Sequence, residues 1–92
     1  PRIIEIFYTK HADARKALEE WYTKTEEADW RCFADIKRTF NSTDAIGDGR
    51  YVFNIKGTHY RIVAEIRFEA KKVYIHFIGT HDKYNKINGL TI

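Results

Sequence analysis

The chain has 92 residues, of which 43% are hydrophobic, and its 16 basic and 13 acidic side chains give a formal net charge of +3. This length and composition predict a single domain over residues 1–92 with one modest core, which excludes an intrinsically disordered or multidomain protein. No run of about 18 apolar residues is present, so we expect no membrane-spanning segment. The first residues lack the layout of a secretory leader, and the single Cys32 has no internal disulfide partner. Both observations favour a cytoplasmic protein.

The first half of the chain is predicted to form one strand and then two helices. Residues 2–8, "RIIEIFY", alternate in the manner of a strand. Thr9 and Thr25 are each suited to cap a following helix. Apolar residues at helical spacing, including Trp21 and then Trp30, mark the buried face of each helix. Residues 41–50, "NSTDAIGDGR", predict a loop.

The second half is predicted to form three strands, over residues 51–55, 60–68 and 73–78. Gly57 and Thr58 suit a tight hairpin turn, which would place Asn54 opposite Arg61. The side chains predicted to pack against the helices are Phe53, Ile55, Ile62, Ile66, Ile75 and Phe77. The opposite side would carry Asn54, Lys56, Arg61, Glu65, Arg67, Tyr74 and His76. The patterns therefore predict an α+β domain with one open, basic sheet face.

Basic residues dominate the chain after Gly49, and this distribution favours an anionic partner, with nucleic acid as the first candidate. Ordinary solvated surface charge is the competing interpretation. In "FIGTHDKYNKI", residues 77–87, a strand ends at Gly79 and five polar or aromatic residues follow. They would arrive at the end of the sheet that carries Lys56 and Arg61. We interpret this segment as the rim of an active site, and a polar helix cap is the alternative.

Two stretches resemble the HigB-type toxins of the RelE superfamily of mRNA interferases. They are "VFNIKGTHYRIVAEI", residues 52–66, and "VYIHFIGTHDKYNKI", residues 73–87. "ALEEWYTKTEEADW" and "DIKRTF" are similar to the family's helices, so the resemblance covers nearly the whole chain. It implies a RelE-like fold: a mostly antiparallel four-stranded sheet with two N-terminal helices on one face, in the order β-α-α-β-β-β.

The resemblance also implies a function. Members of this family are toxins that cut mRNA, often on the ribosome in its A site. They are held inactive by a helix-turn-helix antitoxin of the HigA type. The residues alone leave two other functions open: a non-catalytic module that binds RNA or the ribosome through the same basic face, and a structural partner whose open sheet face docks another protein.

RNA cleavage without a metal uses the 2′-OH of the RNA as nucleophile, and it needs a base, an acid and a cation at the phosphate. Arg61 is the predicted phosphate-binding cation, because its planar fork can bind two oxygens, and the resemblance marks its position as the most recurrent basic one. His81 is the predicted acid or base. Tyr84 is predicted to stack on a base or bind phosphate. Lys56 would assist at the phosphate, or act as base if neighbouring cations favour its neutral form.

Each of these residues also has a purely structural interpretation: a surface arginine, a capping histidine, or a tyrosine that packs the last turn. The further residues predicted to contact RNA are Asn54, His59, His76, Lys83 and Lys86. His76 is equally suited to pair with Glu65 across the strands. The four histidines do not show metal-ligand spacing with Cys32, so we expect neither a zinc site nor any other cofactor.

Overall fold

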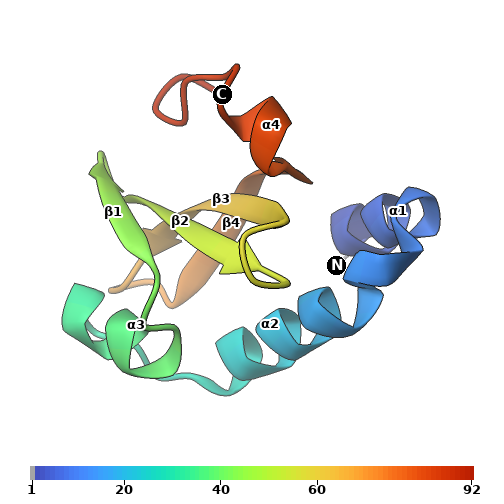
Figure 1. The fold of residues 1–92 in the computed structure, drawn as a ribbon. Coiled ribbons are helices and arrows are strands. Elements are labelled where there is room, and N and C mark those ends of the chain that lie inside the picture. Colours follow the sequence, from blue (N-terminus) through green and yellow to red (C-terminus); the bar gives the residue numbers. More distant parts are fainter. Residues whose placement is uncertain (1) are drawn as a thin grey trace.

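The computed structural model describes residues 2–92. Helices come first in the chain, the strands follow, and a short helix comes after them (Figure 1). In chain order the elements are α1 (Arg2–Lys10), the 3-10 turn η1 (Ala12–Ala14), α2 (Arg15–Glu27), α3 (Phe33–Thr39), β1 (Asp44–Gly47), β2 (Arg50–Ile55), β3 (Tyr60–Arg67), β4 (Lys72–Thr80) and α4 (His81–Tyr84). The strands form one antiparallel sheet in the order β1-β2-β3-β4. The predicted α+β class and four-stranded sheet are confirmed.

The predicted N-terminal strand is wrong, because residues 2–10 form the helix α1. The sequence fits both periods: Ile4, Ile6 and Tyr8 alternate as in a strand, whereas Ile4, Phe7 and Tyr8 recur at helical spacing. In the helix, Ile4 is buried and Phe7 and Tyr8 pack beside it, whereas Ile6 stays exposed. Burial of this helical stripe therefore decides the structure, and the predicted order β-α-α-β-β-β starts with a helix instead.

The fourth strand comes from the predicted loop. Residues 44–47 form β1, in which Asp44 is opposite Val52 and Ala45 is opposite Tyr51. Three consecutive residues with positive φ (Gly47, Asp48 and Gly49) then turn the chain into β2. Thr25 also differs from its prediction, because it lies inside α2 and caps no helix.

The core lies between α1–α3 and one face of the sheet, which we call the helix face (Figure 1). Phe53 is at its centre, with its ring centroid 5.3 Å from that of Trp21, 5.5 Å from Phe40 and 6.3 Å from Trp30. Ile62 and Ile66 of β3 extend the same buried surface. The predicted helix-facing positions on β2 and β3 are confirmed.

The outer face, opposite the helix face, is covered in part by α4 and the segment that follows it (Figure 1). Val52 and Val63 lie on this face and are buried. Gly89 packs closely here: a Cβ at this position would lie 2.7 Å from Ile46 and 3.9 Å from Val63. The open face predicted from sequence is thus only partly open. No helix among residues 2–92 is long and apolar enough to cross a membrane.

A bulge in β4 changes which of its side chains face the helices. Val63 is opposite Phe77 and Ala64 is opposite Ile75, so His76 is an extra residue in the ladder. Beyond the bulge the alternation is reversed. Ile78 packs against the core, and Phe77, predicted on the helix face, lies on the outer face.

Candidate active site

Arg61 is held by contacts on two sides. The hairpin register places it opposite Asn54, as predicted, and Arg61 Nε donates a hydrogen bond to Asn54 Oδ1 at 3.1 Å. Its guanidinium carbon lies 4.8 Å from the centroid of the Tyr84 ring, which is a cation–π distance. The two Nη atoms have no protein partner among residues 2–92. These two nitrogens are therefore the donors that remain for an external group.

The bulge of β4 places Phe77 next to Tyr84. Their ring centroids are 6.3 Å apart and their planes are tilted by 56°, so Tyr84 lies between Phe77 and the guanidinium of Arg61. Gly79 lies opposite Arg61 in the ladder, and any Cβ there would clash with the Phe77 ring. Gly79 therefore allows the ring to occupy the space beside Tyr84.

The segment after Gly79 turns away from the sheet as α4. Thr80 caps this helix, because its Oγ1 accepts a hydrogen bond from Lys83 N at 3.2 Å. Thr80 lies opposite Tyr60, one position from the predicted neighbour Arg61. The backbone N–H of His81 donates to the carbonyl of His59 at 3.1 Å. This bond joins α4 to the β2–β3 turn and brings the backbones of two histidines together.

The β2–β3 connection differs from the tight two-residue turn that was predicted. The ladder ends at Ile55 opposite Tyr60, and residues 56–59 form the turn, with positive φ at Lys56 and Gly57. His59 is exposed, and its Nδ1 lies 2.8 Å from the carbonyl oxygen of Lys56. The imidazole therefore donates from Nδ1, which leaves Nε2 without a partner among the described residues.

Lys56 points away from Arg61 and toward the helical layer. Its Nζ lies 2.9 Å from Asp13 Oδ2, and the hydroxyl of Tyr60 donates to Asp13 Oδ1 at 2.5 Å. The hydrogen bonds from Tyr60 and then Lys56 lower the pKa of the Asp13 carboxyl. Lys56 was predicted to act as a base only if neighbouring cations favoured its neutral form. The charged group next to it is instead the Asp13 carboxylate, so the structure does not provide that condition.

We predict that Asp13→Asn destabilises the protein at neutral pH and much less in acid. The folded-state pKa of Asp13 is lowered, so the ionised carboxylate contributes stability well above its unfolded pKa and loses it as the pH falls through the folded pKa. The difference from wild type in urea unfolding should therefore shrink below about pH 4. Asp44→Asn, an exposed aspartate without an ion pair among residues 2–92, is the matched control. A destabilisation by Asp13→Asn that is equal at pH 7 and pH 3 would contradict this assignment.

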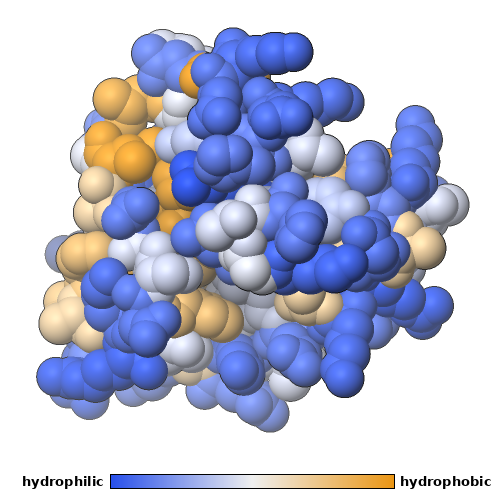
Figure 2. Space-filling view, viewed as in Figure 1, coloured by the Kyte–Doolittle hydropathy of each residue, from blue (hydrophilic) through white to orange (hydrophobic). Residues whose placement is uncertain are grey.

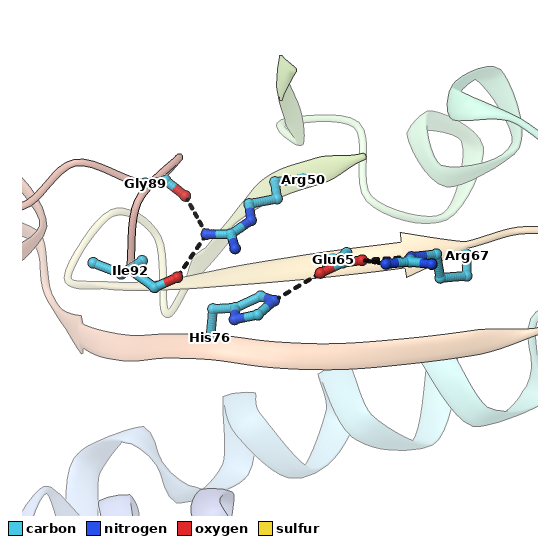
Figure 3. Close-up of polar contacts among 6 residues, drawn as sticks. All are labelled: Arg50, Glu65, Arg67, His76, Gly89 and Ile92. Atoms are coloured by element: carbon cyan, nitrogen blue, oxygen red, sulfur yellow. Dashed lines mark hydrogen bonds and ion pairs between the residues drawn. The ribbon is translucent and has the colours of Figure 1, made fainter. Parts of the chain in front are cut away.

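Glu65 contacts two partners on the outer face (Figure 3). His76 Nε2 lies 3.0 Å from Glu65 Oε1, and Arg67 forms an ion pair with the other carboxylate oxygen. Hydrogen bonds from His76 and then Arg67 lower the Glu65 pKa. The cross-strand pairing of His76 is thus confirmed, and its predicted contact with RNA stays a prediction.

Arg50 fixes the last residues of the chain onto the outer face. Its Nη1 donates to the carbonyl oxygens of Gly89 at 2.9 Å and Ile92 at 2.7 Å (Figure 3). This segment packs on Val63 and Tyr84 through Gly89. Arg50 therefore holds the segment that packs against Tyr84, a role that its position after a loop did not indicate.

The surface around α4 is exposed and polar. Lys83 and Lys86 are both exposed, as phosphate contacts would need to be. Figure 2 shows hydrophilic residues over most of this view, with hydrophobic ones gathered on the side of β1. Within residues 2–92, no group of three or more His, Cys, Asp or Glu side chains is arranged to hold a metal ion.

The structure therefore brings together Arg61, Asn54 and Tyr84 by side-chain contacts. A backbone bond joins His81 to His59 at the same end of the sheet. Lys56 and His76 are engaged elsewhere. Sequence reasoning missed three contributors, namely Phe77, Arg50 and Asp13. A β-bulge has no reliable sequence signal, and the partners of Arg50 and Asp13 are 39 to 47 residues away in the chain.

Comparison with known proteins agrees with the resemblance stated above. The family model described as HigB_toxin, RelE-like toxic component of a toxin-antitoxin system, matches residues 14–87. The chain belongs to the HigB toxin family. The match includes every site residue predicted from the sequence, from Asn54 to Lys86, and leaves out α1 and Asp13.

Similar proteins carry names of the same kind. The mRNA interferase toxin HigB of Escherichia coli strain K12 is 40% identical over 52 residues, which are 54% of this chain and 50% of that protein. The mRNA interferases HigB of Escherichia coli O157:H7 and Shigella flexneri match with the same identity and coverage. The chain thus spans about half the length of each of these relatives.

Proposed function

We propose that this chain is the toxin of a type II toxin–antitoxin pair and that it cleaves mRNA, in the A site of the ribosome, to arrest translation and growth. Its partner would be a helix-turn-helix antitoxin of the HigA type. Family membership supports the class, and the names of the relatives support mRNA as the substrate.

The observation that carries the proposal is that Arg61 is held in place while two of its nitrogen atoms stay available to a ligand. Its Nε donates to Asn54 and its guanidinium carbon lies over the Tyr84 ring, whereas both Nη atoms are unpaired among residues 2–92. A guanidinium oriented in this way presents two parallel N–H groups, which match two phosphate oxygens. An arginine with a purely structural role would direct these groups to a carboxylate or a carbonyl, as Arg50 does.

The reaction follows from these groups. A base removes the proton of the 2′-OH, the 2′-oxygen forms a bond to phosphorus, and the bond from phosphorus to the 5′-oxygen breaks. An acid donates a proton to the departing 5′-oxygen, which leaves a 2′,3′-cyclic phosphate on the upstream fragment. Arg61 would stabilise the charge on the two non-bridging oxygens as the fifth bond forms.

Two histidines at the end of the sheet suit the proton transfers. His81 begins α4 two residues after Gly79, and its backbone is bonded to His59. Imidazole titrates near neutral pH and can serve as acid or base. We assign His81 to proton transfer, with His59 Nε2 as the second candidate. Lys83 and Lys86 would attract the RNA backbone.

Induced expression in bacteria tests the proposal in cells. We expect growth to arrest and full-length mRNA to decrease, and co-expression of the proposed helix-turn-helix antitoxin should restore both. Growth arrest with intact mRNA would favour a non-catalytic RNA- or ribosome-binding module. Normal growth at confirmed soluble expression would contradict the proposed function altogether.

The contact between Tyr84 and Arg61 predicts different effects for two substitutions. Tyr84→Phe should retain most of the cleavage activity, because it keeps the ring that contacts the guanidinium and Phe77. Tyr84→Ala should lose about 10-fold or more, since a cation–π contact of about 1–2 kcal/mol is removed and Arg61 becomes free to move. The measurement is cleavage of a translated mRNA by equal amounts of folded protein. Equal loss in both variants would assign the role to the hydroxyl instead.

A further inference from the structure

A groove of about 420 Å³ lies far from Arg61, at the opposite end of β3, between the second half of α2 and the start of β4. Its floor is apolar and aromatic, formed by Trp21, Ala28, Trp30, Phe68, Val73 and Ile75. Lys71 and Lys72 line the same groove, as does Arg67, whose guanidinium is paired with Glu65, and Glu26 is the one acidic lining residue. It therefore joins an apolar floor to a basic rim.

Two lining residues carry buried polar atoms without a partner. Trp21 is only 2% exposed, and its indole N–H makes no hydrogen bond to the described residues. The hydroxyl of Thr25, one turn later on α2, is in the same condition. Trp30, by contrast, donates its indole N–H to Thr39 Oγ1 at 3.1 Å. Buried donors without an acceptor are rare in folded proteins, and here both lie at the groove.

The strand beside the groove is an edge of the sheet. β4 pairs with β3 alone, so one side of its backbone is unpaired among residues 2–92. An edge strand with an adjacent apolar groove is the arrangement that accepts an added peptide strand, which gains backbone hydrogen bonds and places alternate side chains in the groove. An edge strand offers a row of alternating N–H and C=O groups, which the backbone of another extended peptide matches, so the arrangement favours a peptide.

We propose that this groove binds an extended segment of the antitoxin polypeptide, with apolar side chains on the floor and acidic side chains at Lys71 and Lys72. The inference rests on the proposed function, because it takes the chain to be one member of a toxin–antitoxin pair. The charge of the rim favours an acidic segment, because Lys72 has no ion-pair partner among residues 2–92 and Lys71 is paired there only with the exposed Asp29. The site is remote from Arg61, so the antitoxin can bind here without occupying the active site.

The experiment uses purified protein and the proposed helix-turn-helix antitoxin. Lys71→Glu/Lys72→Glu reverses the charge of the rim, and we expect it to weaken antitoxin binding about 10-fold or more. Lys16→Glu/Lys24→Glu makes the same change in charge on exposed positions of α2 that do not line the groove, and it should bind as wild type does. Hydrogen exchange of the antitoxin complex should show slowed exchange in residues 72–75, with residues 44–47 at the other sheet edge unchanged.

The outcomes separate the inference from the function. If the wild-type chain is toxic and is neutralised, but the rim variant binds antitoxin as tightly as wild type and residues 72–75 exchange at the free rate, the groove assignment is overturned and the function stands. A wild-type chain that is not toxic counts against the proposed function. Loss of RNA binding, or of self-association, in the rim variant with unchanged antitoxin affinity would assign the groove to RNA or to a second copy and also overturn the inference.

Discussion

Replacing Arg61 with alanine should reduce the rate of mRNA cleavage by about 100-fold or more, because the proposed transition state loses the cation on its non-bridging oxygens. The fold should survive this change. The side chain is on the outer face and partly exposed, and its one hydrogen bond to residues 2–92, to Asn54, joins two neighbouring strands of the hairpin. The measurement is the single-turnover rate of cleavage, alongside thermal unfolding of the same preparation.

Arg61→Lys is the informative companion variant. It retains the charge and loses the planar fork that binds two oxygens while Nε is held by Asn54. We expect it to recover only part of the lost rate. Full recovery would show that charge alone is needed, and a folded Arg61→Ala variant that cleaves at the wild-type rate would remove the centre of the proposed mechanism.

His81→Ala and His81→Gln should both lose about 100-fold or more in cleavage rate, because neither side chain can transfer a proton near neutral pH. The structure lets this test separate an effect on catalysis from an effect on folding. The cap of α4 is the Thr80 hydroxyl, and the bond to His59 comes from the His81 backbone, so both contacts survive the substitutions. A cap residue would show the opposite behaviour, with lowered stability and unchanged activity per folded molecule.

The same substitution at the neighbouring histidine assigns the second proton transfer. His59→Gln should also reduce the rate if Nε2 of His59 acts opposite His81, and should leave it unchanged if His59 only contacts RNA. Full activity in His81→Gln would exclude proton transfer by His81 and transfer the role to His59.

The hairpin of β2 and β3 could be predicted closely from the sequence, because clean alternation and a glycine turn fix a register in which any slip would expose the core side chains. Helix α1 could not, because "RIIEIFY" supports either period and its contacts with distant residues decide between them. The bulge at His76 could not either, since an extra residue in a ladder depends on the partner strand.

The candidate site shows the same division. Asn54, Arg61 and Tyr84 were predicted and lie together, because two of them face each other across the hairpin and the third follows the exit at Gly79. Lys56 was predicted from its place in the turn, yet Asp13 attracts its ammonium toward the helices. A pairing over 43 residues of sequence depends on how α1 and η1 pack, which local patterns do not specify.

The central claim is that this fold cleaves RNA through the 2′-OH at a site centred on Arg61. The most direct test incubates the purified chain with translating ribosomes and a defined mRNA and identifies the chemical end of each upstream fragment. The account predicts discrete cuts that end in a 2′,3′-cyclic phosphate for wild type and none for folded Arg61→Ala. Intact mRNA with the wild-type protein bound to ribosomes, or cuts of equal yield from Arg61→Ala, would contradict it.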